Sequence, residues 1–261
     1  MDAVDTALVD IQAGGKIELL ATHTGPLSDQ LREKIIAVAT GFNDSISNVS
    51  TLDHQLASAY AECVSSIMAS CDIQPDKIQA IGSHGQTVRH APNAAIPFTL
   101  QVGNAAQIVE RTGIQTVSDF RQRDLAAGGQ GAPLAPLFHH HLFAESGKNI
   151  VGLNLGGIAK ISVLHADGKI GGFDTGPANT LMDQWIQRHK GQRYDQDANW
   201  ALRGDVNDTL LNKLLSEPWL SQPPPKSTGP ELFNLQWLDN FLAGQEIAAE
   251  DVQRTLCEYS A

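Results

Sequence analysis

Gly171-Gly172-Phe173-Asp174-Thr175-Gly176-Pro177-Ala178-Asn179 is the stretch from which the fold of this sequence can be inferred. The apolar residues that lead into it are typical of a short strand, and apolar residues recur at helical spacing after it. We therefore expect strand, tight turn and helix, with Asp174 projecting from the strand end toward a crevice. Gly176 permits close backbone approach, and the free amides and dipole of the helix favour an anion. This arrangement suits an acid or base beside a phosphate. The alternative is that Asp174 only forms the turn and that Asn179 is a polar residue of the first helical turn.

The composition indicates a soluble globular protein. The chain has 261 residues, of which 42% are hydrophobic and 18% charged, which is enough for one large domain or two joined ones. No apolar run approaches transmembrane length, and the N-terminus carries acid where a signal peptide carries base. The net charge of −11 argues against a nucleic-acid-binding surface, because phosphate contacts need clustered Lys and Arg. The negative net charge does not exclude a small anionic ligand that is held by backbone amides.

The three cysteines are odd in number and scattered along the chain. Cys63 and Cys71 fall in one expected helix, roughly 12 Å apart along its axis, which is too far for a disulfide. Free thiols fit a reducing cytoplasm. Since no membrane segment is expected either, we predict a cytoplasmic protein.

The first half of the chain alternates strands with helices. We expect a hairpin from residues 4–11 and 16–22, helices over 31–38, 52–70 and 105–111, and strands over 78–81, 98–102 and 114–117. Thr51 is the expected N-cap of the long helix, with Asp53 and His54 in its first turn, and Gly113 closes the third helix. Strands that alternate with helices argue for an α/β architecture.

The second half repeats the opening pattern. Residues 119–131 have a loop composition, and two prolines then begin a helix that reaches about Ala144. A hairpin pattern follows, which suggests a weak internal repeat and two domains, residues 1–130 and 131–261. The later strands are expected over 150–155, 158–164 and 169–173, and the later helices over 177–189, 205–215, 235–242 and 249–259. The last helix runs to the final residue without a stop signal, so we expect the sequence to be cut.

Two groups of polar residues are candidate ligand contacts. His84 and Gln86 follow an expected strand and could grip sugar hydroxyls, although a histidine in a polar loop is more often structural. Asp119, Arg121 and Asp124 combine a guanidinium with carboxylates, which suits ligand or inter-domain pairing. A solvated ion-pair loop is the alternative for this second group.

Glycine-rich stretches and a histidine run are weaker signals. Gly128–Gly131 could be a phosphate loop, but it lacks the Lys-Ser/Thr ending of a P-loop. Asn154–Gly157 lies between two expected strands and could let backbone approach a ligand, with a bulge as the ordinary alternative. His139–His141 point in different directions on a helix, which argues against a three-histidine metal site.

Five motifs stand in order along the chain: Ser83-His84-Gly85-Gln86-Thr87, Ser118-Asp119-Phe120-Arg121 through Asp124, Gly128-Gly129-Gln130-Gly131-Ala132-Pro133-Leu134, Asn154-Leu155-Gly156-Gly157-Ile158 and Phe173-Asp174-Thr175-Gly176-Pro177. Together they closely resemble the anhydro-N-acetylmuramic acid kinase family, of the actin/hexokinase/Hsp70-like ATPase superfamily, and the likeness covers nearly the whole chain. The resemblance implies two ribonuclease-H-like halves around a cleft, with the second half incomplete.

The resemblance also implies an activity. The family phosphorylates anhydro-N-acetylmuramic acid with ATP while opening its anhydro ring, and the 6-phosphate that results belongs to peptidoglycan recycling. ATP and Mg²⁺ are implied as cofactors, an amino sugar as substrate and a homodimer as assembly, without a residue assignment for Mg²⁺. Asp174 would be the general base. Nucleotide contacts are expected from Met1, Asp2, Ala3, Val4, Asp5, Asn154, Gly156, Gly157, Thr175, Gly176 and Asn179. Sugar contacts are expected from His84, Gln86, Thr87, Asp119, Arg121, Asp124 and Gln130.

The sequence departs from the family pattern in four places. Members carry Gly-Thr-Ser just before the position of Met1, and they continue past Ala261 through a glycine-rich adenosine-binding segment. Lys160 stands where Asn is usual, and Ala178 stands where Gly is usual. The first phosphate loop and the adenosine segment are therefore expected to be incomplete.

A chain shortened at both ends is expected to be marginally folded. The apolar residues Val252, Leu256 and Tyr259 of its last helix would lack the elements that cover them. We therefore expect self-association and at least about a hundredfold lower activity than the full-length form, through lost nucleotide positioning. Two alternatives stay open: a non-catalytic sugar-binding or dimerising module, and a glycoside hydrolase that uses Asp174 with another acid.

Overall fold

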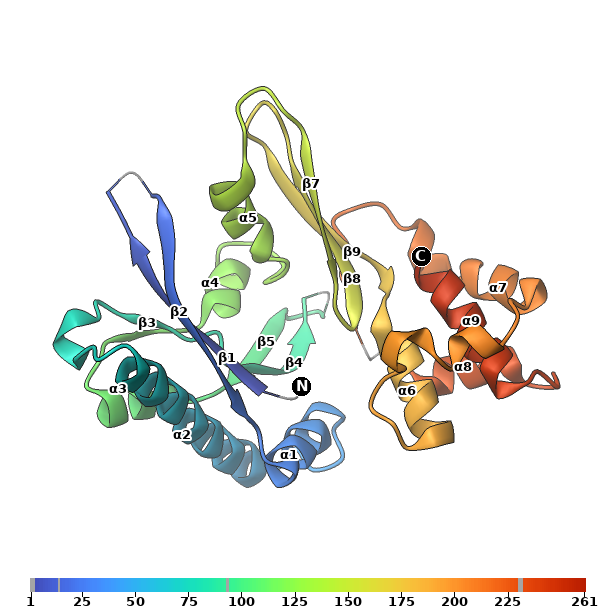
Figure 1. Cartoon of the computed structure of the whole chain (residues 1–261), viewed down its shortest axis with the longest axis horizontal. Coiled ribbons are helices and arrows are strands. Elements are labelled where there is room, and N and C mark those ends of the chain that lie inside the picture. Colours follow the sequence, from blue (N-terminus) through green and yellow to red (C-terminus); the bar gives the residue numbers. More distant parts are fainter. Residues whose placement is uncertain (1–2, 14, 93, 230–231) are drawn as a thin grey trace. The chain divides into compact units, whose positions relative to one another are not determined.

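The computed structural model describes residues 3–13, 15–92, 94–229 and 232–261 (Figure 1). The chain divides into two compact units, residues 1–132 and 133–261. Both units contain helices and strands, so the mixed α/β architecture expected from the sequence is confirmed. The finer assignment of the two units to ribonuclease-H-like halves stays a prediction.

The first unit combines paired strands with helices. β1 (Ala3–Ile11) pairs antiparallel with β2 (Ile17–Pro26), β4 (Gln86–Ala91) antiparallel with β5 (Phe98–Val102), and β3 (Ile81–Gly82) parallel with β6 (Thr116–Val117). The helices are α1 (Asp29–Ala39), α2 (Ile46–Ser70), α3 (Ala105–Thr112) and α4 (Phe120–Ala126). A buried apolar cluster joins α1, α2, β4 and β5, and it includes Ile35, Val38, Leu52, Leu56, Val88 and Val102.

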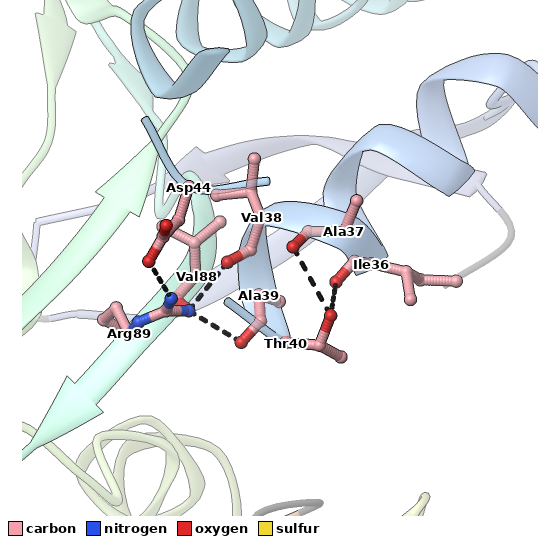
Figure 2. Close-up of polar contacts among 8 residues, drawn as sticks. All are labelled: Ile36, Ala37, Val38, Ala39, Thr40, Asp44, Val88 and Arg89. Atoms are coloured by element: carbon pink, nitrogen blue, oxygen red, sulfur yellow. Dashed lines mark hydrogen bonds and ion pairs between the residues drawn. The ribbon is translucent and has the colours of Figure 1, made fainter. Parts of the chain in front are cut away.

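Arg89 on β4 ties this strand to the C-terminal end of α1 (Figure 2). Its Nη1 donates to the carbonyl oxygens of Val38 and Ala39, each at 2.7 Å, and its Nη2 pairs with the Asp44 carboxylate at 2.7 Å. The last carbonyls of a helix lack intrahelical partners, and a cation at that end also complements the helix dipole. β4, whose first residues are candidate sugar contacts, is thereby fixed to α1.

The long helix α2 begins earlier than the sequence suggests. The Ser45 hydroxyl accepts from the backbone amide three residues on, at 3.3 Å, and is the N-cap. The prediction of Thr51 as N-cap is therefore wrong, and Asp53 and His54 lie beyond the first turn. The segment before Thr51 is rich in Asp, Ser and Asn, all capable caps. Val49 packs against the buried cluster, which places the helix start ahead of it.

Three further predictions for the first unit differ from the structure. β3 covers Ile81–Gly82 instead of residues 78–81. The sequence predicts His84 and Gln86 in a polar loop, but Gln86 begins β4, because residues 86–91 pair with β5. Residues 120–126, inside the predicted loop 119–131, form α4. Short polar elements such as β4 and α4 carry little hydrophobic periodicity, so their partners decide their conformation.

The second unit combines a three-stranded antiparallel sheet with five described α-helices. β7 (Ile150–Leu155), β8 (Ile158–Leu164) and β9 (Ile170–Pro177) pair in that order. The helices are α5 (Ala135–Phe143), α6 (Asn179–Lys190), α7 (Asp208–Leu215), α8 (Leu235–Leu242) and α9 (Ala249–Ser260). α5 packs on β8 and β9, where His139 lies within hydrogen-bond distance of the Ser162 hydroxyl, at 2.8 Å.

The last helix is covered within its own unit. Val252, Leu256 and Tyr259 are 1%, 0% and 9% exposed, and they share one buried cluster with residues of α6, α7 and α8. Trp185 of α6 also donates its indole N–H to the Ala249 carbonyl at 2.8 Å. The expectation that the apolar face of this helix lacks cover is therefore wrong, because α6, α7 and α8 pack on it.

Candidate active site

Asp174 lies inside β9 and not at its end. It pairs with Lys160 of β8, and the register then shifts, so that Thr175 is an extra residue before pairing resumes at Gly176. β9 continues to Pro177, so the prediction of a strand end at Asp174 is wrong. A bulge of this kind bends a strand and redirects its side chains without ending it. Here it leaves the Asp174 side chain only 1% exposed.

Both oxygens of the Asp174 carboxylate have partners. Oδ1 accepts from Lys160 Nζ at 2.8 Å, and Oδ2 accepts from the backbone amide of Thr228 at 2.9 Å. The Asp174 amide donates in turn to the Lys226 carbonyl at 3.0 Å. A buried carboxylate is stable only where its charge is compensated and its oxygens are hydrogen-bonded. Asp174 is thus a buried, oriented and charge-compensated carboxylate.

Lys226 anchors the segment that holds Asp174. Its side chain is buried, its Nζ donates to the Leu220 carbonyl at 2.7 Å, and it lies 4.4 Å from the centre of the Trp219 ring. Burial lowers the pKa of Lys226. The carbonyl contact and the aromatic face compensate for the loss of water around the ammonium. We call residues 226–228 the strap, and its position against Asp174 is fixed by this anchor.

The turn Asn154–Gly157 meets the start of α6. The amides of Ala178 and Thr180 donate to the Gly157 carbonyl, each at 3.0 Å, and the amide of Asn179 donates to the Gly156 carbonyl at 3.1 Å. The expectation of free amides at this helix start is wrong, because the β7–β8 turn supplies acceptors for amides that lack intrahelical partners.

The two glycines of this turn are not required by packing within the protein. A Cβ added at Gly156 would meet Asn154 Oδ1 at 3.5 Å, and one at Gly157 would meet Thr180 Cβ at 3.7 Å, which are ordinary contact distances. Glycine in such a place is typical of a site where another group approaches the backbone closely. The residues present therefore fit a ligand at this turn.

His84 and Arg121 form a hydrogen-bonded pair in the first unit. Arg121 Nε donates to His84 Nε2 at 2.7 Å, and His84 Nδ1 lies 2.7 Å from the Gly85 carbonyl, which assigns the ring proton to Nδ1. Although part of the ring faces solvent, the pKa of His84 is lowered, chiefly by desolvation and also by the Arg121 guanidinium. Both ring nitrogens are engaged, so His84 orients Arg121 in this structure.

Asp124 organises the glycine-rich loop that follows α4. Its Oδ2 accepts from the Gly131 amide at 2.7 Å, and its backbone carbonyl accepts from the Gly129 amide at 2.9 Å. Arg121 Nη1 donates to the Gly131 carbonyl at 3.2 Å. These contacts favour a structural loop over a phosphate loop at residues 128–131. Gln130 lies half-buried within the loop.

A pocket of about 200 Å³ in the first unit brings His84 and Asp119 together. Asp119 has a φ of 61°, and its carboxylate accepts from the Ser118 hydroxyl at 3.0 Å. A non-glycine residue held in this left-handed conformation is a feature that clusters at functional sites. The other predicted sugar contacts do not line this pocket; they are Gln86, Thr87, Arg121, Asp124 and Gln130.

The remaining candidate residues lie in β1, in the second unit or outside the residues that the structure describes. Met1 and Asp2 lie outside the described residues, and Ala3 and Val4 belong to β1. On the same strand, the Asp5 carboxylate accepts from the Thr24 hydroxyl at 2.8 Å. A second pocket, of about 370 Å³, lies in the second unit and includes only Asn179 of the predicted nucleotide contacts.

Comparison with known sequences decides the family. The sequence model described as "Anhydro-N-acetylmuramic acid kinase" matches residues 1–261, the whole chain.

The chain belongs to this family.

Three relatives with that printed name illustrate the likeness. The protein from Vibrio vulnificus (strain CMCP6) is 50% identical over 261 residues, which cover 100% of this chain and 70% of the relative. The one from Haemophilus influenzae is 44% identical over 269 residues, which cover 99% of this chain and 70% of the relative. The one from Coxiella burnetii (strain Dugway 5J108-111) is 45% identical over 263 residues, which cover 100% of this chain and 70% of the relative. The resemblance inferred from the five motifs is thus confirmed, and the chain is a kinase.

Sequence reasoning missed three residues of the chain as partners of Asp174. Lys160 stood out only as an unusual residue, and Lys226 and Thr228 carried no signal of a role. A lysine at an inward position of a strand otherwise rich in apolar residues is a signal that could have indicated a buried acidic partner. The strap lacks such a signal, because it is a loop.

Membership of a kinase family implies ATP as a substrate. Because Mg²⁺ usually accompanies ATP, we also asked which residues could hold this ion. In the part of the chain that the structure describes, His, Cys, Asp and Glu form no group of three or more that could hold a metal. Mg²⁺ usually needs only one or two carboxylates, with phosphates and water completing its shell. In the same described ranges, no helix is long and apolar enough to cross a bilayer.

Proposed function

We propose that the chain phosphorylates anhydro-N-acetylmuramic acid with ATP, opening its anhydro ring to give the 6-phosphate, as a step of peptidoglycan recycling. Membership of the family supports the kinase activity and the sugar. The observation that carries the catalytic assignment is Asp174, a carboxylate only 1% exposed and fixed by two hydrogen bonds. A buried and oriented carboxylate of this kind suits a general base.

In the proposed reaction, Asp174 removes a proton from a water molecule whose oxygen bonds to the anomeric carbon of the sugar. The bond from that carbon to the bridging oxygen O6 breaks. The released O6 bonds to the γ-phosphorus of ATP as the bond to the β-phosphate oxygen breaks, and ADP leaves. The proton stays on Asp174 until it passes to solvent. Proton transfer of this type contributes about 10²–10⁴-fold to a rate.

The nucleotide and sugar contacts of this proposal follow the motifs. The turn around Gly156 and Gly157 has room for close approach and would face the phosphates. Mg²⁺ bound with the nucleotide would neutralise phosphate charge and orient the phosphates. The pocket that joins His84 and Asp119 would receive part of the sugar. We also propose that the protein acts in the cytoplasm as a homodimer.

The test is the variant Asp174→Asn, with Asp167→Asn as control, because Asp167 lies in an exposed turn next to β9. We expect Asp174→Asn to lower turnover by about 10²–10⁴-fold, measured as ADP release in the presence of the sugar, because the general base is lost. Sugar binding, measured by calorimetry, should be nearly unchanged. Asp167→Asn should behave as the unaltered chain does.

Near-normal turnover of Asp174→Asn would remove Asp174 from the role of base. Ring opening of the sugar without ATP would favour the glycoside hydrolase alternative. Sugar binding by the unaltered chain without ATP binding or turnover would favour the non-catalytic module.

A further inference from the structure

The burial of Asp174 conflicts with its proposed role. A general base needs an oxygen within reach of the proton it accepts. In this structure, Oδ1 is 2.8 Å from Lys160 Nζ and Oδ2 is 2.9 Å from the Thr228 amide, and the residue is 1% exposed. Each oxygen can still accept a second hydrogen bond, but at 1% exposure a neighbouring group has to move before a water molecule can reach either of them.

The contact with Thr228 is the harder one to open. Thr228 belongs to the strap, which also accepts from the Asp174 amide through the Lys226 carbonyl at 3.0 Å. The Lys226 ammonium is itself held by the Leu220 carbonyl and by the face of Trp219. Lifting the strap would leave buried backbone groups unpaired and would uncover a buried ammonium, and both changes are costly.

The contact with Lys160 is the easier one to open. The Lys160 side chain is 43% exposed, and its ammonium sits on a flexible stem that can turn toward solvent. Lys160 also lies on the same β7–β8 hairpin as the turn Asn154–Gly157. At that turn, the amides of residues 178–180 are occupied by carbonyls, so they do not serve an anion in this structure. Lys160 brings a full positive charge to this hairpin.

We propose that Lys160 is a displaceable counter-ion of Asp174, and that the phosphates of the nucleotide draw its ammonium away. This inference rests on the proposed function. Until nucleotide binds, Lys160 compensates the buried carboxylate and occupies Oδ1. When the phosphates take the ammonium, Oδ1 becomes available to the proton of water. Lys160 thereby links activation of the base to the presence of ATP, which restrains opening of the sugar ring before a phosphoryl donor is in place.

The experiment measures binding of ATP with Mg²⁺, without sugar, by calorimetry. The proteins are the unaltered chain, Lys160→Met, Asp174→Asn and the double variant. Asp174→Asn should bind ATP about two- to fivefold more tightly, since the ammonium no longer has to leave an ion pair. Lys160→Met should bind less tightly. In the double variant, the gain from Asp174→Asn should vanish.

Two further variants serve as controls. Lys169→Met removes the cation of an exposed Lys–Asp pair of the same length, 2.8 Å, at the turn before β9, and it should leave ATP affinity unchanged. Lys160→Arg keeps the charge and should retain most of the affinity. If Lys160→Met alone fails to fold, because it leaves a buried charge unpaired, the double variant removes both charges and is compared directly with Asp174→Asn.

If the double variant binds ATP more tightly than Lys160→Met does, the gain comes from removing repulsion between Asp174 and the phosphates. That result would overturn the proposal. Equal ATP affinity in the four proteins would overturn it as well. In both cases, loss of turnover in Asp174→Asn would leave the proposed function intact. Absence of ATP binding to the unaltered chain would overturn both proposals together.

Discussion

Asp174 and His84 both have their polar atoms engaged, but their partners differ in kind. Asp174 meets a half-exposed ammonium and a fixed amide, so one of its contacts can be exchanged. His84 accepts from Arg121 on one ring nitrogen and lies against the Gly85 carbonyl on the other, so its proton position is set. A neutral imidazole can hold the guanidinium of Arg121 without charge repulsion, and at the scale of single residues this protonation state is the feature to test.

The contact between His84 and Arg121 should depend on pH. The pKa of His84 is lowered from 6.5 in the folded chain, so the unfolded chain binds this proton more readily. The stability from this contact is therefore fully present above about pH 6.5 and is lost as the pH falls through the lowered pKa. We expect NMR to show the His84 ring titrating below 6.5, with the Arg121 Nε–H signal changing at the same midpoint. His84→Gln, which identifies the ring signals, should abolish that change. A midpoint above 6.5 would contradict the prediction.

At the scale of elements, contacts between residues distant in sequence decide where a helix begins and how closely it packs on a sheet. The start of α2 is set by Ser45, although Thr51 is an equally capable capping residue type. α5 lies so close to β9 that a Cβ at Gly172 would collide with the Pro136 ring and would lie 2.9 Å from the Ile161 carbonyl oxygen. Both features follow from packing, and each can be tested with a matched pair of variants.

Ser45→Ala and Thr51→Ala distinguish the two possible starts of α2. Ser45→Ala should lower the free energy of unfolding by about 1 kcal/mol, because it removes the N-cap. Thr51→Ala should have little effect, because the Thr51 hydroxyl bonds the Ser47 carbonyl inside the helix and alanine favours helix. Urea denaturation followed by circular dichroism measures both. The reverse order of effects would restore Thr51 as the cap.

Gly172→Ala and Gly171→Ala test the close approach of α5 to the sheet. Gly172→Ala should lower the free energy of unfolding by about 1–3 kcal/mol, because the added methyl group has no space. A Cβ at Gly171 meets no atom within 4 Å, so Gly171→Ala should be nearly neutral. Thermal unfolding of the two variants gives the comparison. Equal melting temperatures would show that α5 does not pack on β9 as described.

At the scale of the whole molecule, charge and exposed apolar surface act against each other. Each unit has its own buried cluster, and the helix at the end of the chain is part of one of them. Large apolar side chains nevertheless remain exposed along β7, where Val151, Leu153 and Leu155 are 60%, 61% and 57% exposed. The net charge of −11 opposes association of these surfaces between molecules at neutral pH.

Self-association should therefore increase as the pH falls from 8 toward the isoelectric point, about 5.1, because repulsion between molecules disappears there. Light scattering across this range, at constant protein concentration, measures the effect. Added salt at pH 8 should produce a weaker increase, because it screens the same repulsion. Replacing Leu153, in the middle of the exposed row on β7, by Lys should reduce association at pH 5. Scattering that is independent of pH would contradict the prediction.

Local patterns determined the α/β class, most of the strand and helix positions, and the family. The hairpin over 3–26, the strands β5, β7 and β8, and the helix α8 could be predicted because hydrophobic periodicity and turn residues are properties of neighbouring positions. The five motifs identified the family for the same reason, since each is a short run of specific residues.

Only the tertiary structure decided what Asp174 touches and what covers the last helix. Lys160 lies 14 residues from Asp174 and Thr228 lies 54 residues away, so strand register and the path of the strap bring them together. The β7–β8 turn likewise occupies the amides of α6, and α6, α7 and α8 bury the apolar face of α9. The physical reason is that charge compensation, hydrogen-bond satisfaction and burial depend on neighbours in space, which the spacing of residues in one segment does not specify.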